Sequence, residues 1–203
     1  CRIILMIPPR HGKSELATIK FPSWILGKSP ALSVIVCSYS QELATDFGLS
    51  TRDVMNTPNY REIFSTRLRT DSQAKANWLT ESGGRYLAVG IGGGITGKGF
   101  HIGIIDDPFK NREEADSEVV REARWKWYRS TFLTREEGNG AIVVICTRWH
   151  DDDLVGRILR EEGAAEWEVV KLQAVAEQDE PYRKTGEALW PERFNLEMLE
   201  TRK

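Results

Sequence analysis

The chain has 203 residues, of which 40% are hydrophobic and 29% are charged, and its formal net charge is −2 at pH 7. This length suits one medium-sized domain, and the composition excludes a disordered chain. Because the net charge is close to zero, any contact with nucleic acid must come from a local patch or an assembled surface. The apolar runs are too short to span a bilayer, and the three cysteines, an odd number, indicate free thiols in a reducing compartment.

Apolar runs of strand length alternate with helical patterns, which indicates an α/β fold with a mainly parallel central sheet flanked by helices. In chain order, we expect a strand at 2–7, a helix at 14–26 that Pro22 kinks or ends, and a strand at 32–38. A helix at 41–56 with Ser40 as its cap, and strands at 78–80 and 85–89, come next. The remaining elements are a strand at 101–105, a helix at 113–130, a strand at 141–146, a helix at 152–160 and a strand at 167–174.

The first strand leads into a loop that has the form of a phosphate-binding loop. Residues 7–14, IPPRHGKS, match G-x-x-x-x-G-K-[ST] except that Ile7 replaces the first glycine. Lys13 is expected to reach the β and γ phosphates of ATP, Ser14 to ligate Mg²⁺, and Arg10 to neutralise the γ-phosphate. Alternatively, Gly-Lys-Ser is a chance tripeptide at a helix start and Arg10 is a solvated charge. The predicted nucleotide-binding residues are Pro9, Arg10, His11, Gly12, Lys13 and Ser14.

Two short strands, 78–80 and 85–89, are separated by a turn with two glycines and are expected to form a β-hairpin. A glycine-rich loop at 90–99 follows. Its glycines at 92, 94 and 97 fit G-x-G-x-x-G, but the pattern does not open a helix. A mobile loop is therefore favoured over a dinucleotide site.

The apolar strand at 101–105 ends in two carboxylates, which is the Walker B form of P-loop enzymes. Asp106 is expected to hold Mg²⁺, directly or through water. Asp107 is expected to orient or deprotonate the attacking water. Asp-Asp-Pro is also a common way to turn the chain and cap a helix. The phosphate loop upstream favours the Walker B interpretation of the two aspartates over this alternative.

Thr147 follows the strand at 141–146, where its hydroxyl is well placed to sense the γ-phosphate. It could instead satisfy a backbone group. His150 and the aspartates at 151–153 have no second histidine at ligand spacing, so a role near the helix start is favoured over a metal cluster. The helix at 113–130 mixes aromatic with basic residues, which indicates core packing on one face or, alternatively, a DNA-binding surface.

Several segments together resemble the ATPase domain of tailed-phage terminase large subunits, over nearly the whole chain and in order. They are PPRHGKSE, CSYSQELATDFG, ITGKGFHIGIIDDPFKNREEA, WKWY, CTRWHDDDLVGRIL and GEALWPERF. The resemblance implies a P-loop ATPase of the class with an additional strand and a catalytic carboxylate. Such a motor uses ATP and Mg²⁺ to drive double-stranded DNA into a procapsid.

The resemblance also implies roles for residues and partners. Thr147 matches the motif that couples γ-phosphate loss to movement, and the loop arginine that Arg10 matches serves catalysis. Members work as homo-oligomeric rings at the portal protein, often with a small terminase subunit, in the host cytoplasm. A trans-acting basic finger comes from a neighbouring subunit, and Lys98 and Arg85 are the candidates here.

The resemblance divides the chain into an ATPase domain at 1–176 and a linker at 177–203. The segment that cradles adenine in the family would precede Cys1, and an RNase H-like nuclease domain would follow the linker. The chain by itself is then expected to hydrolyse ATP weakly and not to cut DNA. Two other functions remain open: a P-loop helicase-like ATPase that acts on nucleic acid, and a catalytically silent nucleotide-binding scaffold.

Overall fold

The structure is a computed structural model that describes residues 1–201. Within these residues, eight strands form one sheet in the order β3-β4-β5-β2-β6-β7-β1-β8. The strands are β1 (Arg2–Met6), β2 (Ser33–Ser38), β3 (Leu68–Gln73), β4 (Asn77–Thr80), β5 (Arg85–Gly90), β6 (Phe100–Asp106), β7 (Glu136–Cys146) and β8 (Glu168–Lys171). The sheet confirms the predicted α/β class.

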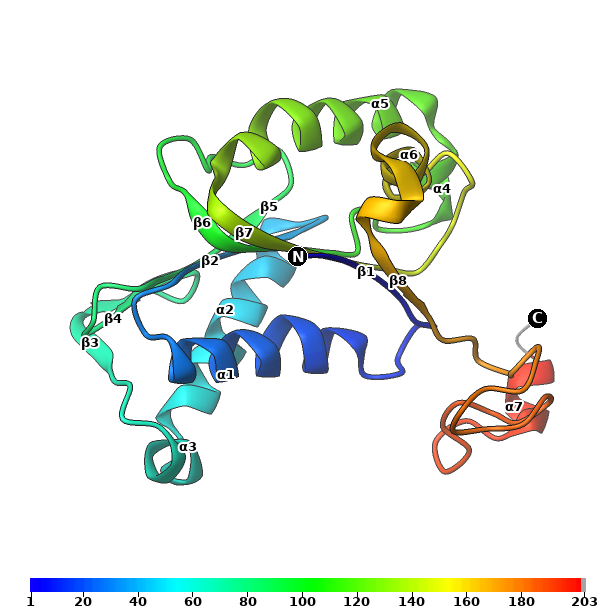
Figure 1. The fold of residues 1–203 in the computed structure, drawn as a ribbon, viewed down its shortest axis with the longest axis horizontal. Helices are drawn as coiled ribbons and strands as arrows, with labels where there is room; N and C mark the ends of the chain where they lie inside the picture. Colours follow the sequence, from blue (N-terminus) through cyan, green and yellow to red (C-terminus); the bar gives the residue numbers. More distant parts are fainter. Residues whose placement is uncertain (202–203) are drawn as a thin grey trace.

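Helices cover both faces of this sheet (Figure 1). One face carries the π-helical turn η1 (Glu15–Lys20), α1 (Phe21–Lys28) and α2 (Gln41–Asn56), and α3 (Pro58–Ile63) lies beyond α2. The other carries α4 (Arg112–Asp116), α5 (Glu118–Trp127) and α6 (Leu154–Ile158). Shorter turns are η2 (Tyr128–Phe132), η3 (Leu133–Arg135), η4 (Leu159–Gly163) and η5 (Ala164–Glu166), and α7 (Leu196–Glu200) comes last.

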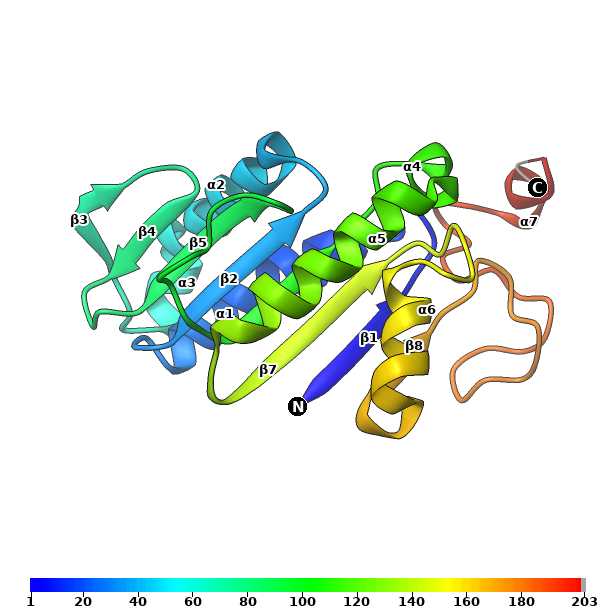
Figure 2. The same cartoon turned by 90° about the horizontal axis from the view of Figure 1, so that it is seen from above.

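The central strands are parallel, and β7 lies between β1 and β6. Figure 2 shows β7 running beside β1. The position of β7 fits the additional strand that the family resemblance implies, and the carboxyl ends of β1, β6 and β7 lie at one edge of the sheet. β5 also runs parallel to β2, whereas β4 pairs antiparallel with β5 and forms the predicted hairpin. Gly83, at φ 84°, supplies the left-handed residue that this turn requires.

Strand residues alternate between two apolar cores, as the pleat of a strand dictates. In β2, Val34 and Val36 pack toward α1 and α2, whereas Ile35 and Cys37 pack toward α5 and α6. All four side chains are fully buried, which explains why β2 reads as a continuous apolar run. Within residues 1–201, no helix has both the length and the apolar character needed to cross a membrane.

The helix after the phosphate loop continues through Pro22 to Lys28, so the proline does not end it. The π-helical turn η1 ends two residues before the proline, and the Phe21 N–H donates to the Leu16 carbonyl, five residues back. Proline lacks an N–H and clashes with the carbonyl four residues earlier. The wider π turn accommodates that defect within one continuous helix.

The single helix predicted at 113–130 is wrong, because α4 ends at Asp116 and a new helix begins at Glu118. Ser117 lies between them with extended backbone, and its hydroxyl accepts from the Val120 N–H as a cap. The elements α3 and β3 were not predicted at all. β8 covers only residues 168–171 of the strand expected at 167–174.

Candidate functional site

The phosphate loop lies at the carboxyl edge of the parallel strands, between β1 and the helix that starts with Lys13. Its backbone needs two left-handed residues, Arg10 at φ 61° and Gly12 at φ 80°. Only glycine takes this conformation without steric cost. The Leu16 N–H donates to the Gly12 carbonyl at 3.0 Å, which starts the helix and leaves its first N–H groups free to meet an anion.

Three predicted catalytic residues meet at this edge because β7 separates β1 from β6. The Lys13 ammonium lies 2.8 Å from Asp107 Oδ2 and 3.2 Å from Thr147 Oγ1. The Thr147 N–H donates to Asp107 Oδ1 at 3.0 Å. Lys13 is 7% exposed, so its charge is held inside the fold and faces this group.

Asp107 adopts a left-handed backbone at φ 45°, which is uncommon for a residue other than glycine. Its N–H donates to the Ile145 carbonyl at 2.8 Å, and its carboxylate accepts from the Thr147 N–H. These two bonds tie Asp107 to the end of β7 and point its carboxylate toward Lys13. Such conformations cost about 1–3 kcal/mol and cluster at functional sites.

Asp106 is 1% exposed, and its Oδ2 accepts a 2.6 Å hydrogen bond from the fully buried Thr18 hydroxyl. Burial raises the pKa of Asp106 to about 6, against a lowering by the Thr18 hydrogen bond. The Ser14 hydroxyl also lowers this pKa, to a smaller extent, so Ser14 lies near Asp106. Asp106 Oδ1 is buried and has no hydrogen-bond partner among the described residues.

Thr18 is a member of this site that the sequence interpretation missed. It follows Ser14 by four residues, and that spacing places two side chains on one face of a helix. The spacing could have identified it, but nothing in the sequence showed that its hydroxyl would reach a carboxylate on β6.

The segment after Thr147 is held by two charged groups. The Arg148 guanidinium lies 2.7 Å from the buried Asp153 carboxylate, which also caps α6 by accepting from the Gly156 N–H. Asp152 accepts from three arginines on α5, α6 and η4, and these bonds hold its pKa well below the usual range. The arginines are Arg121, Arg157 and Arg160, with N–O distances of 3.2, 2.8 and 2.8 Å.

Asp152 and Asp153 therefore hold the start of α6, the structural role that the sequence analysis favoured. His150 Nδ1 accepts from the Asp152 N–H at 2.9 Å. Within residues 1–201, no three His, Cys, Asp or Glu side chains gather to hold a metal ion. Trp127 and Tyr128 lie in the core, which agrees with the favoured interpretation of that helix.

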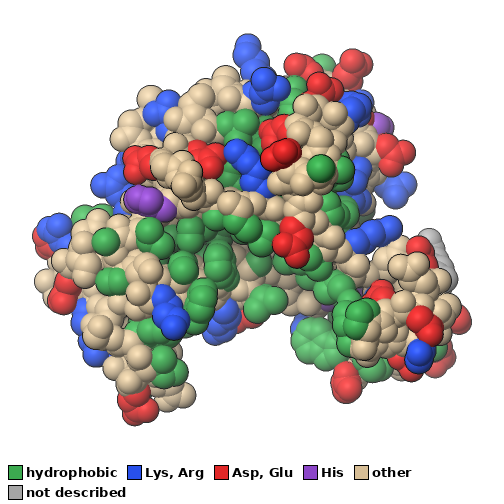
Figure 3. Space-filling view, in the orientation of Figure 1, with side chains coloured by type: hydrophobic (Ala, Val, Ile, Leu, Met, Phe, Trp, Pro, Cys, Tyr) green, Lys and Arg blue, Asp and Glu red, His purple; other side chains and the backbone are tan. Residues whose placement is uncertain are grey.

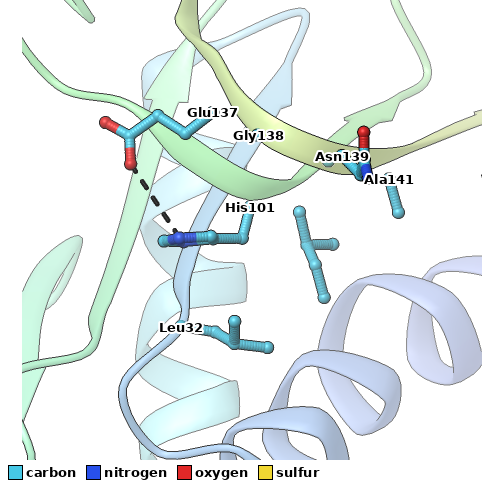
Figure 4. Close-up of a pocket in the computed structure, with 8 residues that line it drawn as sticks. Leu32, His101, Glu137, Gly138, Asn139 and Ala141 are labelled. Carbon is cyan, nitrogen blue, oxygen red and sulfur yellow. Dashed lines mark ion pairs between the residues drawn. The ribbon is translucent and has the colours of Figure 1, made fainter.

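Arg10 is exposed, and no polar contact of its side chain occurs among the described residues. Arg85 and Lys98 lie near the amino ends of β5 and β6, at the edge of the sheet opposite the phosphate loop. Neither can reach this chain's own site, so a finger role would require a neighbouring subunit and stays a prediction. The same edge holds a pocket of about 310 Å³, where His101 faces Glu137 at 4.0 Å (Figure 4).

A larger crevice, of about 630 Å³, adjoins the phosphate loop. It lies among the loop, the ends of β1 and β7, and residues 171–177 that follow β8. The chain then folds back, since Val175 bridges Ala188 and the Phe194 ring lies 4.6 Å from the His11 ring. Residues 177–201 of the segment predicted as a linker form the lobe at the lower right of Figure 3, and Phe194 in this lobe contacts the phosphate loop.

The family model described as "Terminase large subunit, T4likevirus-type, N-terminal" matches residues 4–203. The chain belongs to this terminase family. A crystal structure of the HK97 bacteriophage large terminase has the same fold, with a TM-score of 0.57 and 18% sequence identity. The alignment covers 88% of this chain and 36% of that one, so the terminase chain described here spans about a third of that protein. No curated protein matches. Membership in this family implies a part of the phage DNA-packaging machinery.

Proposed function

We propose that this terminase domain binds ATP with Mg²⁺ and hydrolyses it, and that hydrolysis drives double-stranded DNA into a procapsid. The observation that carries the proposal is the meeting of Lys13, Asp107 and Thr147, which come from the segments after β1, β6 and β7, beside a glycine-containing loop at a helix start. That combination offers a phosphate cradle, a cation and a carboxylate at one point. Membership in the terminase family supports the packaging role.

The side chains at this edge suit a magnesium ion. Asp106 presents a buried carboxylate oxygen without a hydrogen-bond partner among the described residues, and the Ser14 hydroxyl lies beside it. Mg²⁺ prefers oxygen ligands and is usually held by one or two protein groups together with substrate phosphates. We infer that Ser14 and Asp106 hold it. Bound there, the ion would neutralise charge that develops on the phosphate oxygens.

The remaining residues then have distinct tasks in hydrolysis. Lys13 exchanges its contact with Asp107 for the β and γ phosphates, and this exchange frees the Asp107 carboxylate. Asp107 orients a water whose oxygen bonds to the γ-phosphorus while the bond to the bridging oxygen of ADP breaks, and the carboxylate accepts the water's proton. Thr147 contacts both residues, so its hydroxyl can register the loss of the γ-phosphate. Arg10 adds positive charge from the loop.

The partners proposed for the motor follow from the family. They are double-stranded DNA, a homo-oligomeric ring, the portal protein and a small terminase subunit in the host cytoplasm. In such a ring, Lys98 or Arg85 would act on a neighbour's nucleotide. Nuclease activity would belong to a further domain, toward which residues 177–203 lead.

Steady-state ATP turnover of the purified protein, with and without double-stranded DNA, tests this function. We expect DNA-stimulated turnover that Lys13→Ala abolishes, and no separation of DNA strands. Stimulated turnover with strand separation would favour the helicase-like alternative. Nucleotide binding without turnover, under conditions in which the ring assembles, would favour the silent scaffold.

A further inference from the structure

Two buried polar atoms without hydrogen-bond partners lie at the ends of neighbouring strands. Ser38, the last residue of β2, is fully buried, and its hydroxyl has no partner among the described residues. Asp106 Oδ1, at the end of β6, is also buried and has no partner among them. Most buried side-chain polar atoms in proteins are paired, because leaving one unpaired costs its full desolvation penalty. Each of these two atoms therefore requires a partner.

The register of the sheet places the two side chains next to each other. β2 and β6 run parallel, and Ser38 is the register partner of Asp106. Two residues earlier on these strands, Val36 and Ile104 pack in the core beneath η1, α1 and α2. Because side chains alternate along a strand, Ser38 and Asp106 point to that same face. Neighbouring strands lie about 4.8 Å apart, so rotation about one bond can bring a serine hydroxyl to a carboxylate oxygen.

The other neighbour of Ser38 in the sheet offers no acceptor side chain. On β5, Ser38 pairs with Gly90. The backbone groups beside it are already bonded, since the Ser38 carbonyl accepts from the Ile91 N–H at 2.8 Å and the Gly90 N–H donates to Gln41 Oε1 at 3.0 Å. Of the two register partners of Ser38, only Asp106 presents a side-chain acceptor.

We propose that Ser38 is a positioning residue of the magnesium site, and that its hydroxyl donates to Asp106 Oδ1 while Thr18 donates to Oδ2. The inference rests on the proposed ATP site and its magnesium ion. Hydroxyls from two separate elements, η1 and β2, then fix the plane of the carboxylate before the ion binds. A carboxylate has about four lone-pair positions, so about two remain for the ion or its waters. Groups that orient metal ligands in this way typically change metal affinity by roughly 10- to 100-fold.

ADP binding with and without Mg²⁺ isolates the contribution of the metal. Calorimetry would measure the dissociation constant of ADP in Mg²⁺ and in EDTA, and the ratio of the two constants is the magnesium enhancement. Because Ser38 lies three strands away from β1, we expect Ser38→Ala to keep the ADP affinity in EDTA and to reduce the magnesium enhancement by roughly 10-fold. Ser38→Cys keeps the shape of the side chain but is a weak donor, so it should behave in the same way.

Ser23→Ala is the matched control, because it removes another buried serine hydroxyl, one that donates to the Lys20 carbonyl. This variant should keep the full magnesium enhancement.

Urea unfolding of the protein without metal or nucleotide tests the hydrogen bond itself. Removing a buried hydroxyl that has no partner leaves no other group unpaired, so an unbonded Ser38 predicts a urea midpoint for Ser38→Ala at or above that of wild type. A bond to Asp106 predicts a lower midpoint instead. The loss should shrink when the same change is made in Asp106→Ala, because the acceptor is then absent.

Full magnesium enhancement in Ser38→Ala or Ser38→Cys, an equal reduction in Ser23→Ala, or a urea midpoint of Ser38→Ala at or above wild type would each overturn the role of Ser38 and leave the ATP site intact. If wild type bound ADP no more tightly in Mg²⁺ than in EDTA, or if Lys13→Ala bound ADP as well as wild type does, the proposed ATP site would fail instead. The urea midpoints would then still decide whether Ser38 holds Asp106.

Discussion

Replacing the buried Thr18 hydroxyl tests how the acidic pair is held. Thr18→Val keeps the branched shape of the side chain and removes the 2.6 Å hydrogen bond to Asp106 Oδ2. A carboxylate that is 1% exposed would then lose this bond at Oδ2, while its Oδ1 already has no hydrogen-bond partner among the described residues. Hydrogen bonds to charged groups contribute about 1.5–3 kcal/mol. We expect the free energy of unfolding to fall by roughly 2–3 kcal/mol at pH 8.

Urea unfolding of the magnesium-free protein measures this loss, and Thr18→Ser is the control because it keeps the hydroxyl. The Thr18 hydrogen bond lowers the pKa of Asp106, so its loss should raise that pKa further. Burying a neutral carboxyl without a hydrogen-bond partner costs less free energy than burying a carboxylate. The loss in unfolding free energy caused by Thr18→Val should therefore be smaller at pH 5. Equal stability of the Val and Ser variants, or a cost independent of pH, would refute this reasoning.

Three further predictions concern stability. Burial raises the pKa of Asp106 to about 6 in the folded protein. The neutral carboxyl therefore contributes its full stabilisation to the free energy of unfolding below about pH 4, and this contribution is lost as the pH rises through about 6. Magnesium-free Asp106→Asn should accordingly exceed wild type in unfolding free energy by up to about 3 kcal/mol at pH 8, and the two should converge below pH 4. Ser40→Ala removes the cap that accepts from the Leu43 N–H and should cost about 1 kcal/mol by the same measurement, whereas Asp46→Ala on the exposed face of α2 should cost much less. The three arginines lower the pKa of Asp152, so the Asp152 carboxylate stabilises the fold above its unfolded pKa and loses that effect as the pH falls through its folded pKa. Asp152→Asn should thus lower the melting temperature at pH 7. Salt at about 1 M should reduce the difference in melting temperature between the variant and wild type.

The parallel sheet could be predicted because each central strand is an apolar run that ends in a recognisable motif. Once β1, β6 and β7 were identified, a shared carboxyl edge followed from parallel pairing. Lys13, Asp107 and Thr147 each follow one of these strands, and in the structure their side chains meet at this edge.

The remaining details depend on interactions between residues that are distant in sequence. Pro22 reads as a helix breaker, but a π turn of buried residues packed on α2 keeps the helix continuous. Thr18 and Asp106 are 88 residues apart, so no local pattern links them. The segment after 177 is polar enough to suggest a linker, yet Phe194 packs against the phosphate loop.

The measurement that tests the central claim most directly follows Mg·ATP binding and ATP turnover in wild type, Lys13→Ala and Asp107→Asn. Lys13 would hold the phosphates, whereas Asp107 would act only on the attacking water. We predict that Lys13→Ala loses binding and turnover together, and that Asp107→Asn binds Mg·ATP but turns it over at least 100-fold more slowly, within the usual range for general acid–base catalysis, about 10²–10⁴-fold. Wild-type turnover in Asp107→Asn, or unchanged binding in Lys13→Ala, would contradict the assignment of this edge of the sheet as an ATPase site.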